Sequence, residues 1–177
     1  MNRFTKISGR GAVALAAAGA AAAGATPAAV AATAPPSKVG TTLTVQGLGA
    51  LRLGVKPAQV SALLGKPARI VGRTVNGTVI QIYRYPRYGL KVVFGGPSAA
   101  ALGVDEVSVA SRRYRMVDTG LRVGAALATV KKAYPQGRCA SSTPGGRTVI
   151  CTDNGGEGGI NFVLRNGKRV SSIYVDG

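Results

Sequence analysis

Two cysteines are the strongest nucleophiles that this sequence offers. Cys139 and Cys151 lie twelve residues apart, symmetric about Gly145 in a Gly-rich stretch. A turn at Gly145 would set the two cysteines opposite each other on a hairpin, where a disulfide forms in an oxidising compartment. Since a bridged pair carries no thiolate, we expect a structural cross-link and no catalytic cysteine.

Carboxylates are the next candidates for chemistry. The six acids are Asp105, Glu106, Asp118, Asp153, Glu157 and Asp176, and the sequence contains no histidine. Asp105 and Glu106 are adjacent in an expected strand, so their side chains should point to opposite faces and form no carboxylate pair. Asp153 and Glu157 flank a Gly-rich turn that has oxygen ligands for a hard cation, although a solvated turn is the favoured interpretation. The sequence therefore predicts no enzyme, no metal site and no small-molecule cofactor.

An export signal opens the chain. Arg3, Lys6 and Arg10 precede an Ala-rich apolar stretch, and Ala29-Val30-Ala31 is an A-x-A cleavage site. This layout predicts a signal peptide over residues 1–31 and a flexible lead-in over 32–40. We expect a secreted or extracytoplasmic bacterial protein without a transmembrane span.

The charge of the remaining chain is strongly basic. The signal holds three of the 23 basic residues and none of the six acids, which leaves a net charge of +14 after cleavage. No acid precedes Asp105. Such an excess favours an acidic protein surface or an anionic polymer as partner.

A sequence pattern recurs at an offset of 70 residues. Leu51-Arg52-x-Gly54 returns as Leu121-Arg122-x-Gly124, and apolar patterns further along match at the same offset. We interpret this as an α+β tandem repeat in one compact domain, with units over 41–112 and 113–177. Each unit is expected to be a short helix packed on an antiparallel β-meander, with the helices beginning near Pro57 and Leu127.

The first unit contains a clear hairpin signal. Asn76-Gly77 separates two β-rich runs, 69–75 and 78–85, and Asn-Gly suits a type I′ turn. A two-residue turn sets Arg69 opposite Arg84, and the following turn sets Arg84 opposite Lys91. One face then carries four cations around aliphatic side chains: Arg69, Arg73, Arg84 and Lys91, with Ile80 and Ile82. The other face carries Tyr83 and Tyr85 and is expected to form the core.

The tandem arrangement, the Gly turn before each helix and the pair Cys139 and Cys151 resemble the secreted β-lactamase-inhibitory protein family. More distantly, Gly54 and Leu64-Gly65-Lys66-Pro67 resemble the small lipoproteins of the outer-membrane barrel-assembly machinery. The first resemblance implies the tandem fold and an open sheet face that binds a partner. No inhibitory-loop residue of that family matches a position here, so inhibition of a β-lactamase is only an analogy.

These observations favour a secreted, non-enzymatic protein-binding module, one form of which is an inhibitor of an acidic extracellular protein. The expected partner-binding residues are Arg69, Arg73, Arg84, Lys91, Ile80 and Ile82. The alternatives are a binder of anionic polymers, either cell-wall polymer or nucleic acid, and an envelope or structural protein. Nucleic acid is not favoured, because Tyr83 and Tyr85 are expected in the core and would not stack with bases.

Overall fold

The computed structural model describes residues 38–142, 147–153 and 159–177. Three sequence predictions fall wholly or largely outside these ranges. They are the signal peptide and most of the lead-in, the turn around Gly145, and the Gly-rich segment that holds Glu157.

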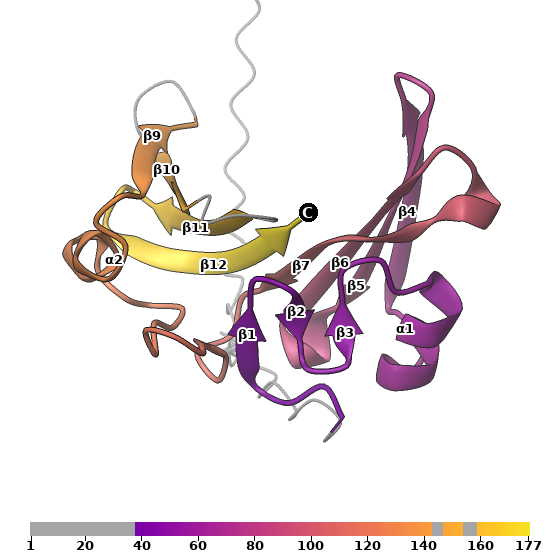
Figure 1. Ribbon diagram of the computed structural model, residues 1–177, viewed down its shortest axis with the longest axis horizontal. Helices are drawn as coiled ribbons and strands as arrows, with labels where there is room; N and C mark the ends of the chain where they lie inside the picture. The colour runs from indigo at the N-terminus through magenta and orange to yellow at the C-terminus, as the bar shows by residue number, and fades with distance from the viewer. Residues whose placement is uncertain (1–37, 143–146, 154–158) are drawn as a thin grey trace, which may run out of the picture.

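Eight strands form one continuous antiparallel sheet (Figure 1). In spatial order they are β4 (Arg69–Val75), β5 (Thr78–Tyr85), β6 (Leu90–Gly96), β7 (Gly103–Val109), β12 (Arg169–Asp176), β11 (Gly159–Arg165), β10 (Thr148–Asp153) and β9 (Arg138–Ser141). The two outer strands, β4 and β9, are the edges. The centre is the pair β7–β12, which joins segments more than sixty residues apart in sequence.

A second, smaller sheet covers part of one face of the large one. Its order is β3 (Leu51–Arg52), β2 (Gly47–Leu48), β1 (Thr42–Thr44) and β8 (Arg115–Met116), with β8 parallel to β1. Helices α1 (Pro57–Leu64) and α2 (Leu127–Ala133) and two short 3-10 turns, Pro86–Tyr88 and Ala99–Ala101, complete the described structure. Neither α-helix has the length or apolar character needed to cross a membrane, within the described ranges.

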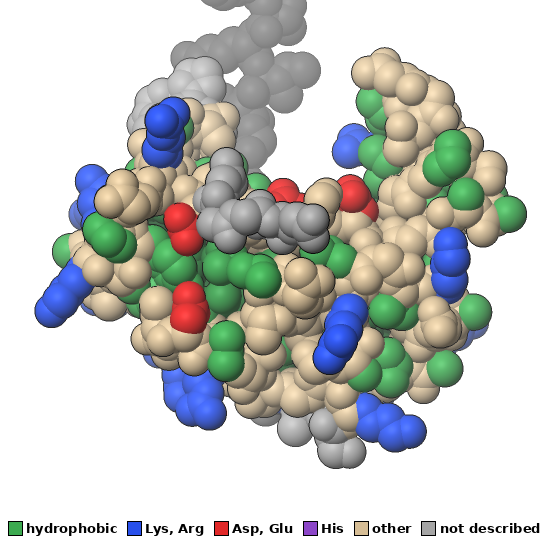
Figure 2. All heavy atoms as spheres, in the orientation of Figure 1, with side chains coloured by type: hydrophobic (Ala, Val, Ile, Leu, Met, Phe, Trp, Pro, Cys, Tyr) green, Lys and Arg blue, Asp and Glu red, His purple; other side chains and the backbone are tan. Residues whose placement is uncertain are grey.

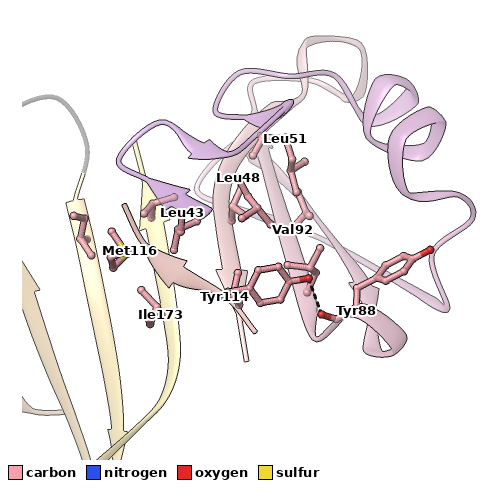
Figure 3. Packing of buried hydrophobic residues seen from close by; sticks show 14 of the residues in the cluster. Leu43, Leu48, Leu51, Tyr88, Val92, Tyr114, Met116 and Ile173 are labelled. Atoms are coloured by element: carbon pink, nitrogen blue, oxygen red, sulfur yellow. Dashed lines mark hydrogen bonds between the residues drawn. The ribbon is translucent and has the colours of Figure 1, made fainter. Parts of the chain in front are cut away.

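The core lies between the large sheet and these covering elements. In the small sheet, the buried side chains of Leu48 and Leu51 lie beside Val92 of the large sheet, and Leu43 lies toward Met116 and Ile173 (Figure 3). Val60 and Leu64 are the buried side chains of α1, and Gly65 ends that helix with positive φ. The opposite face of the large sheet carries no described helix or strand, and we call it the open face.

The predicted fold, an α+β tandem repeat of helix-plus-meander units, is wrong. The described structure is mostly β, and its α-helices are only eight and seven residues long. The strands do not divide into two separate meanders, because β7 pairs with β12 in one sheet of eight. The small sheet also joins β1 to β8 across the expected boundary between residues 112 and 113. Local patterns placed the helices but did not indicate these long-range pairings.

The two hairpin predictions are confirmed. Residues Arg69–Val75 and Thr78–Tyr85 pair in the expected register around Asn76-Gly77, both of which have positive φ. Cys139 and Cys151 lie directly opposite each other on β9 and β10 and form a disulfide. This cross-link is typical of an extracytoplasmic protein.

Candidate binding surface on the open sheet face

A single row of side chains crosses the open face from one edge to the other. Neighbouring residues in the row are cross-strand partners in the sheet register. In order, the row is Arg69, Arg84, Lys91, Ser108, Tyr174, Asn161, Thr152 and Arg138. Since side chains of directly opposed strand residues lie on one face, the row is a continuous polar strip with cations at both ends.

All six residues predicted as partner-binding lie on this face. Arg69, Arg73 and Arg84 are exposed, whereas Lys91, Ile80 and Ile82 are half-buried. Arg69, Arg84 and Lys91 are consecutive in the row, and Arg73 is opposite Ile80. Their role in binding stays a prediction.

One of the four predicted cations, Lys91, is paired with a carboxylate. The Lys91 ammonium lies 2.7 Å from Oε1 of Glu106 on the neighbouring strand β7. Among the described residues, no carboxylate forms an ion pair with Arg69, Arg73 or Arg84. Three guanidinium groups therefore remain available to an incoming anion, while Lys91 is already paired.

A β-bulge changes the arrangement of the acids. Val93 is opposite Glu106 and Phe94 is opposite Val104, which leaves Asp105 as the extra residue on β7. A Cβ placed on Gly95 would lie 3.4 Å from Cγ of Asp105, and Gly95 faces the same side as Val93. The expectation that Asp105 and Glu106 point to opposite faces is therefore wrong, because a bulge interrupts the alternation of side chains.

A third carboxylate joins these two at the centre of the open face. Asp176 is the cross-strand partner of Glu106. Figure 2 shows acidic side chains at the floor of the hollow between the two ends of the sheet. No group of acidic or cysteine side chains among the described residues has the arrangement to hold a metal ion. The centre of the face is thus acidic, while its β4–β5 end is basic.

The second half of the open face is polar and carries two exposed cations on different strands, Arg138 opposite Thr152 and Arg165 opposite Thr148. Thr152 donates a hydrogen bond to Asn161 at 2.7 Å, and the Asn161 amide donates one to Asp176 at 3.1 Å. Burial, together with the nearby carboxylates of Asp176 and Glu106, raises the pKa of the Tyr174 phenol. Sequence reasoning missed this half because it searched for clustered charge.

Two hollows lie along the row, one in each half. The first, of about 400 Å³, is lined by Arg69, Arg84 and Lys91 together with Pro86, Ser108 and Ala110. The second, of about 580 Å³, is lined by Arg138, Ile150, Thr152, Asn161 and Tyr174, among others. The open face therefore has two depressions that differ in charge and lie along the same row of side chains.

The tyrosines next to this face do not form a stacking platform. Tyr83 and Tyr85 are buried on the opposite side of β5, as predicted, and Tyr83 packs edge-on against Phe94. Burial raises the pKa of Tyr85 to about 12. The exposed Tyr-Arg-Tyr pattern needed to stack successive bases is therefore absent from β5.

Comparison with known proteins does not identify a family for this chain. No protein-family model matches this chain, and no protein of curated function does. An extracellular protein from Bacillus anthracis that contains an SCP domain is similar at a TM-score of 0.46 and 14% identity, over 70% of this chain and 43% of that one. A DUF4309 family protein, YjgB, from Bacillus subtilis is similar at a TM-score of 0.47 and 15% identity, over 69% of this chain and 78% of that one. Neither is a β-lactamase-inhibitory protein, and similarity at this level bears on no function.

Proposed function

We propose that this chain is an exported, non-enzymatic module that binds another protein through the open face of its eight-stranded sheet. The observation that carries the proposal is the group of three exposed guanidinium groups, Arg69, Arg73 and Arg84, which border half-buried aliphatic side chains on a face with no described cover. Like charges close together do not stabilise a fold, whereas an apolar floor with an Arg rim suits an acidic protein surface. One form of the proposed binding is inhibition of an acidic extracellular protein.

The acidic centre of the face favours a protein over an anionic polymer. A polyanion lying along the row from Arg84 to Arg138 would pass beside Glu106 and Asp176, the register pair next to Ser108 and Tyr174 on the same face. Repulsion at the centre would offset the attraction at the ends. A folded protein can instead present carboxylates to the Arg side chains and a cation or an amide to the centre.

The test compares two charge-matched double variants of the mature protein. Arg69→Glu/Arg84→Glu reverses two cations on the open face, and Lys66→Glu/Lys132→Glu reverses two exposed cations away from it. Each immobilised protein is used to capture partners from bacterial culture medium, and the affinity of a recovered protein is measured by calorimetry at low and moderate salt. We expect one saturating partner whose affinity falls about 100-fold with the face variant and changes little with the control.

Two outcomes would contradict the proposal. One is equal loss of binding by both variants, because non-specific charge would then account for retention. The other is recovery of no protein, together with salt-dependent retention of the chain on teichoic acid or nucleic acid. That second result would support the polymer-binding alternative.

A further inference from the structure

The β4 edge of the large sheet is long, regular and uncovered. All seven β4 residues pair with β5 without a bulge, whereas both β6–β7 and β11–β12 contain a register shift. The turn between β4 and β5 stands clear of the other elements (Figure 1). Natural proteins usually protect such an edge with a bulge, a proline, a covering segment or charged side chains. Among the described residues, β4 has only the last of these, Arg69 and Arg73, which repel a basic strand and attract an acidic one.

The hairpin geometry identifies which main-chain groups face outward. The two-residue turn closes on the pair Val75–Thr78, and hydrogen-bonded pairs alternate along an antiparallel ladder. The odd-numbered residues of β4 therefore bond to β5, while the N–H and C=O groups of Ile70, Gly72 and Thr74 point away from the sheet. No main-chain hydrogen bond from another described element reaches these three residues.

The side chains of β4 define what could pair there. On the open side, Arg69 and Arg73 are exposed and flank Val71. On the other side, Ile70 is 55% exposed, although most large apolar residues of the sheet are buried. A matching strand would carry acid, apolar and acid residues at alternate positions on one face, and an apolar residue against Ile70 on the other.

A second copy of this chain does not meet that requirement. Antiparallel pairing of two β4 strands would bring Arg69 and Arg73 of one copy close to the same residues of the other, and like charges across a ladder destabilise it. The segment of this chain before β1 is also unsuitable, because it contains no acid and includes Pro35-Pro36.

We propose that β4 is a docking edge for an extended acidic segment of a partner protein, which adds a ninth strand to the sheet. Main-chain hydrogen bonds to Ile70, Gly72 and Thr74 would supply affinity, and Arg69 and Arg73 would select alternate acidic side chains. This mode goes beyond the proposed function, since it adds the main-chain edge of β4 to the side chains of Arg69 and Arg73 that both modes share. Gly72→Pro tests the edge and Arg84→Glu tests the open face, so the failure of one mode can be told from the failure of the other.

The test uses a synthetic fluorescent peptide, Thr-Glu-Ile-Val-Thr-Glu-Thr, and measures its binding by fluorescence anisotropy. Three control peptides are used. The first has Lys in place of Glu, and the second has the same composition with the two Glu residues adjacent. The third carries N-methyl groups on the alternate residues whose N–H groups would bond to β4. We expect saturable binding of the first peptide and at least about 10-fold weaker binding of each control, the ratio that corresponds to one lost hydrogen bond or charge contact.

Two protein variants locate the binding. Gly72→Pro removes an outward N–H and should weaken the peptide at least about 10-fold, while Gly72→Ala keeps the N–H and should bind as wild type does. A Cβ at Gly72 meets nothing closer than 3.9 Å. Hydrogen exchange should show new protection of Ile70, Gly72 and Thr74 on binding. Thermal unfolding checks that both variants fold, and the N-methyl peptide provides the same test if the proline variant does not.

Equal binding of the Glu and Lys peptides would overturn the proposal, and so would unchanged affinity for the N-methylated peptide. Protection confined to the open face, with Arg84→Glu weakening the peptide more than Gly72→Pro does, would also overturn it. That last result would leave the open-face proposal standing.

Discussion

The two ends of the large sheet are held by different means. At one end, the β4–β5 hairpin has seven register pairs and closes with Asn76-Gly77, whose positive φ angles suit the tight turn. At the other end, the β9–β10 hairpin has four register pairs and a disulfide between Cys139 and Cys151. A hairpin with long pairing and favourable turn residues needs no cross-link, whereas a short one gains most from a covalent bond.

Tyrosine hydroxyls in the two halves also have different kinds of acceptor. In the first half, the Tyr114 hydroxyl donates a buried hydrogen bond to the main-chain oxygen of Tyr88 at 2.8 Å (Figure 3). In the second, the Tyr134 hydroxyl donates to the Asp118 carboxylate at 2.8 Å. The two hydroxyls therefore differ in acceptor, a neutral main-chain oxygen in the first half and a carboxylate in the second.

Loss of the disulfide is the largest effect we expect. Cys139→Ala/Cys151→Ala should lower the free energy of unfolding by about 3 kcal/mol, the value for closing a loop of this size. Urea denaturation measures the loss, and hydrogen exchange locates it. Exchange should rise in β9 and β10 and stay low in β4 and β5. Equal opening of both hairpins would mean that the two ends of the sheet do not differ as described.

Alkaline pH should act on the first half through Tyr114. Burial raises the pKa of Tyr114 to about 12 from a usual value of 10.0. Below pH 10 the phenol is protonated in both the folded and unfolded states. Between pH 10 and 12 the unfolded state loses the proton first, so the folded state becomes less stable as pH rises.

The measurement is the free energy of unfolding of wild type and Tyr114→Phe at pH 8, 10 and 12. At pH 8 the variant should lose about 1 kcal/mol with its hydrogen bond. From pH 10 to 12 the wild type should lose roughly 2 kcal/mol more than the variant. A variant profile that falls as steeply as the wild-type profile would contradict burial of this phenol.

The turn residue should give the smallest of the three effects. Gly77 has φ +78, which a β-branched residue adopts at a cost of about 1–2 kcal/mol. Gly77→Val should therefore destabilise the protein by about 1 kcal/mol in urea denaturation, while Gly72→Ala, at a strand position without positive φ, should not. If Gly77→Val has no effect, the Asn-Gly turn is not what holds the first hairpin.

The sequence allowed prediction of features that depend on neighbours along the chain. The Asn76-Gly77 turn, the register of Arg69 with Arg84 and the buried side of Tyr83 follow from turn chemistry and side-chain alternation. The disulfide followed from the spacing of two cysteines about a Gly-rich turn. Each of these involves residues less than about twenty positions apart.

The features that were missed depend on distant pairing or on a break in alternation. The strands Gly47–Leu48 and Leu51–Arg52 contain two residues each, too few to show a period, and acquire their order from the sheet around them. The bulge at Asp105 moved one carboxylate to the open face. Gly95 and Gly96 in the opposing strand were its only local signal, since glycine within a strand often marks a bulge.

The position of β12 has a consequence for how the nascent chain must mature. This strand lies between β7 and β11, yet it is made after both. Until residues Arg169–Asp176 emerge, β7 and β11 each present a free edge with apolar side chains such as Val107 and Phe162. Partly synthesised chains are therefore at risk of aggregation through these temporary edges, and an export pathway that holds the chain unfolded until it is complete would remove that risk.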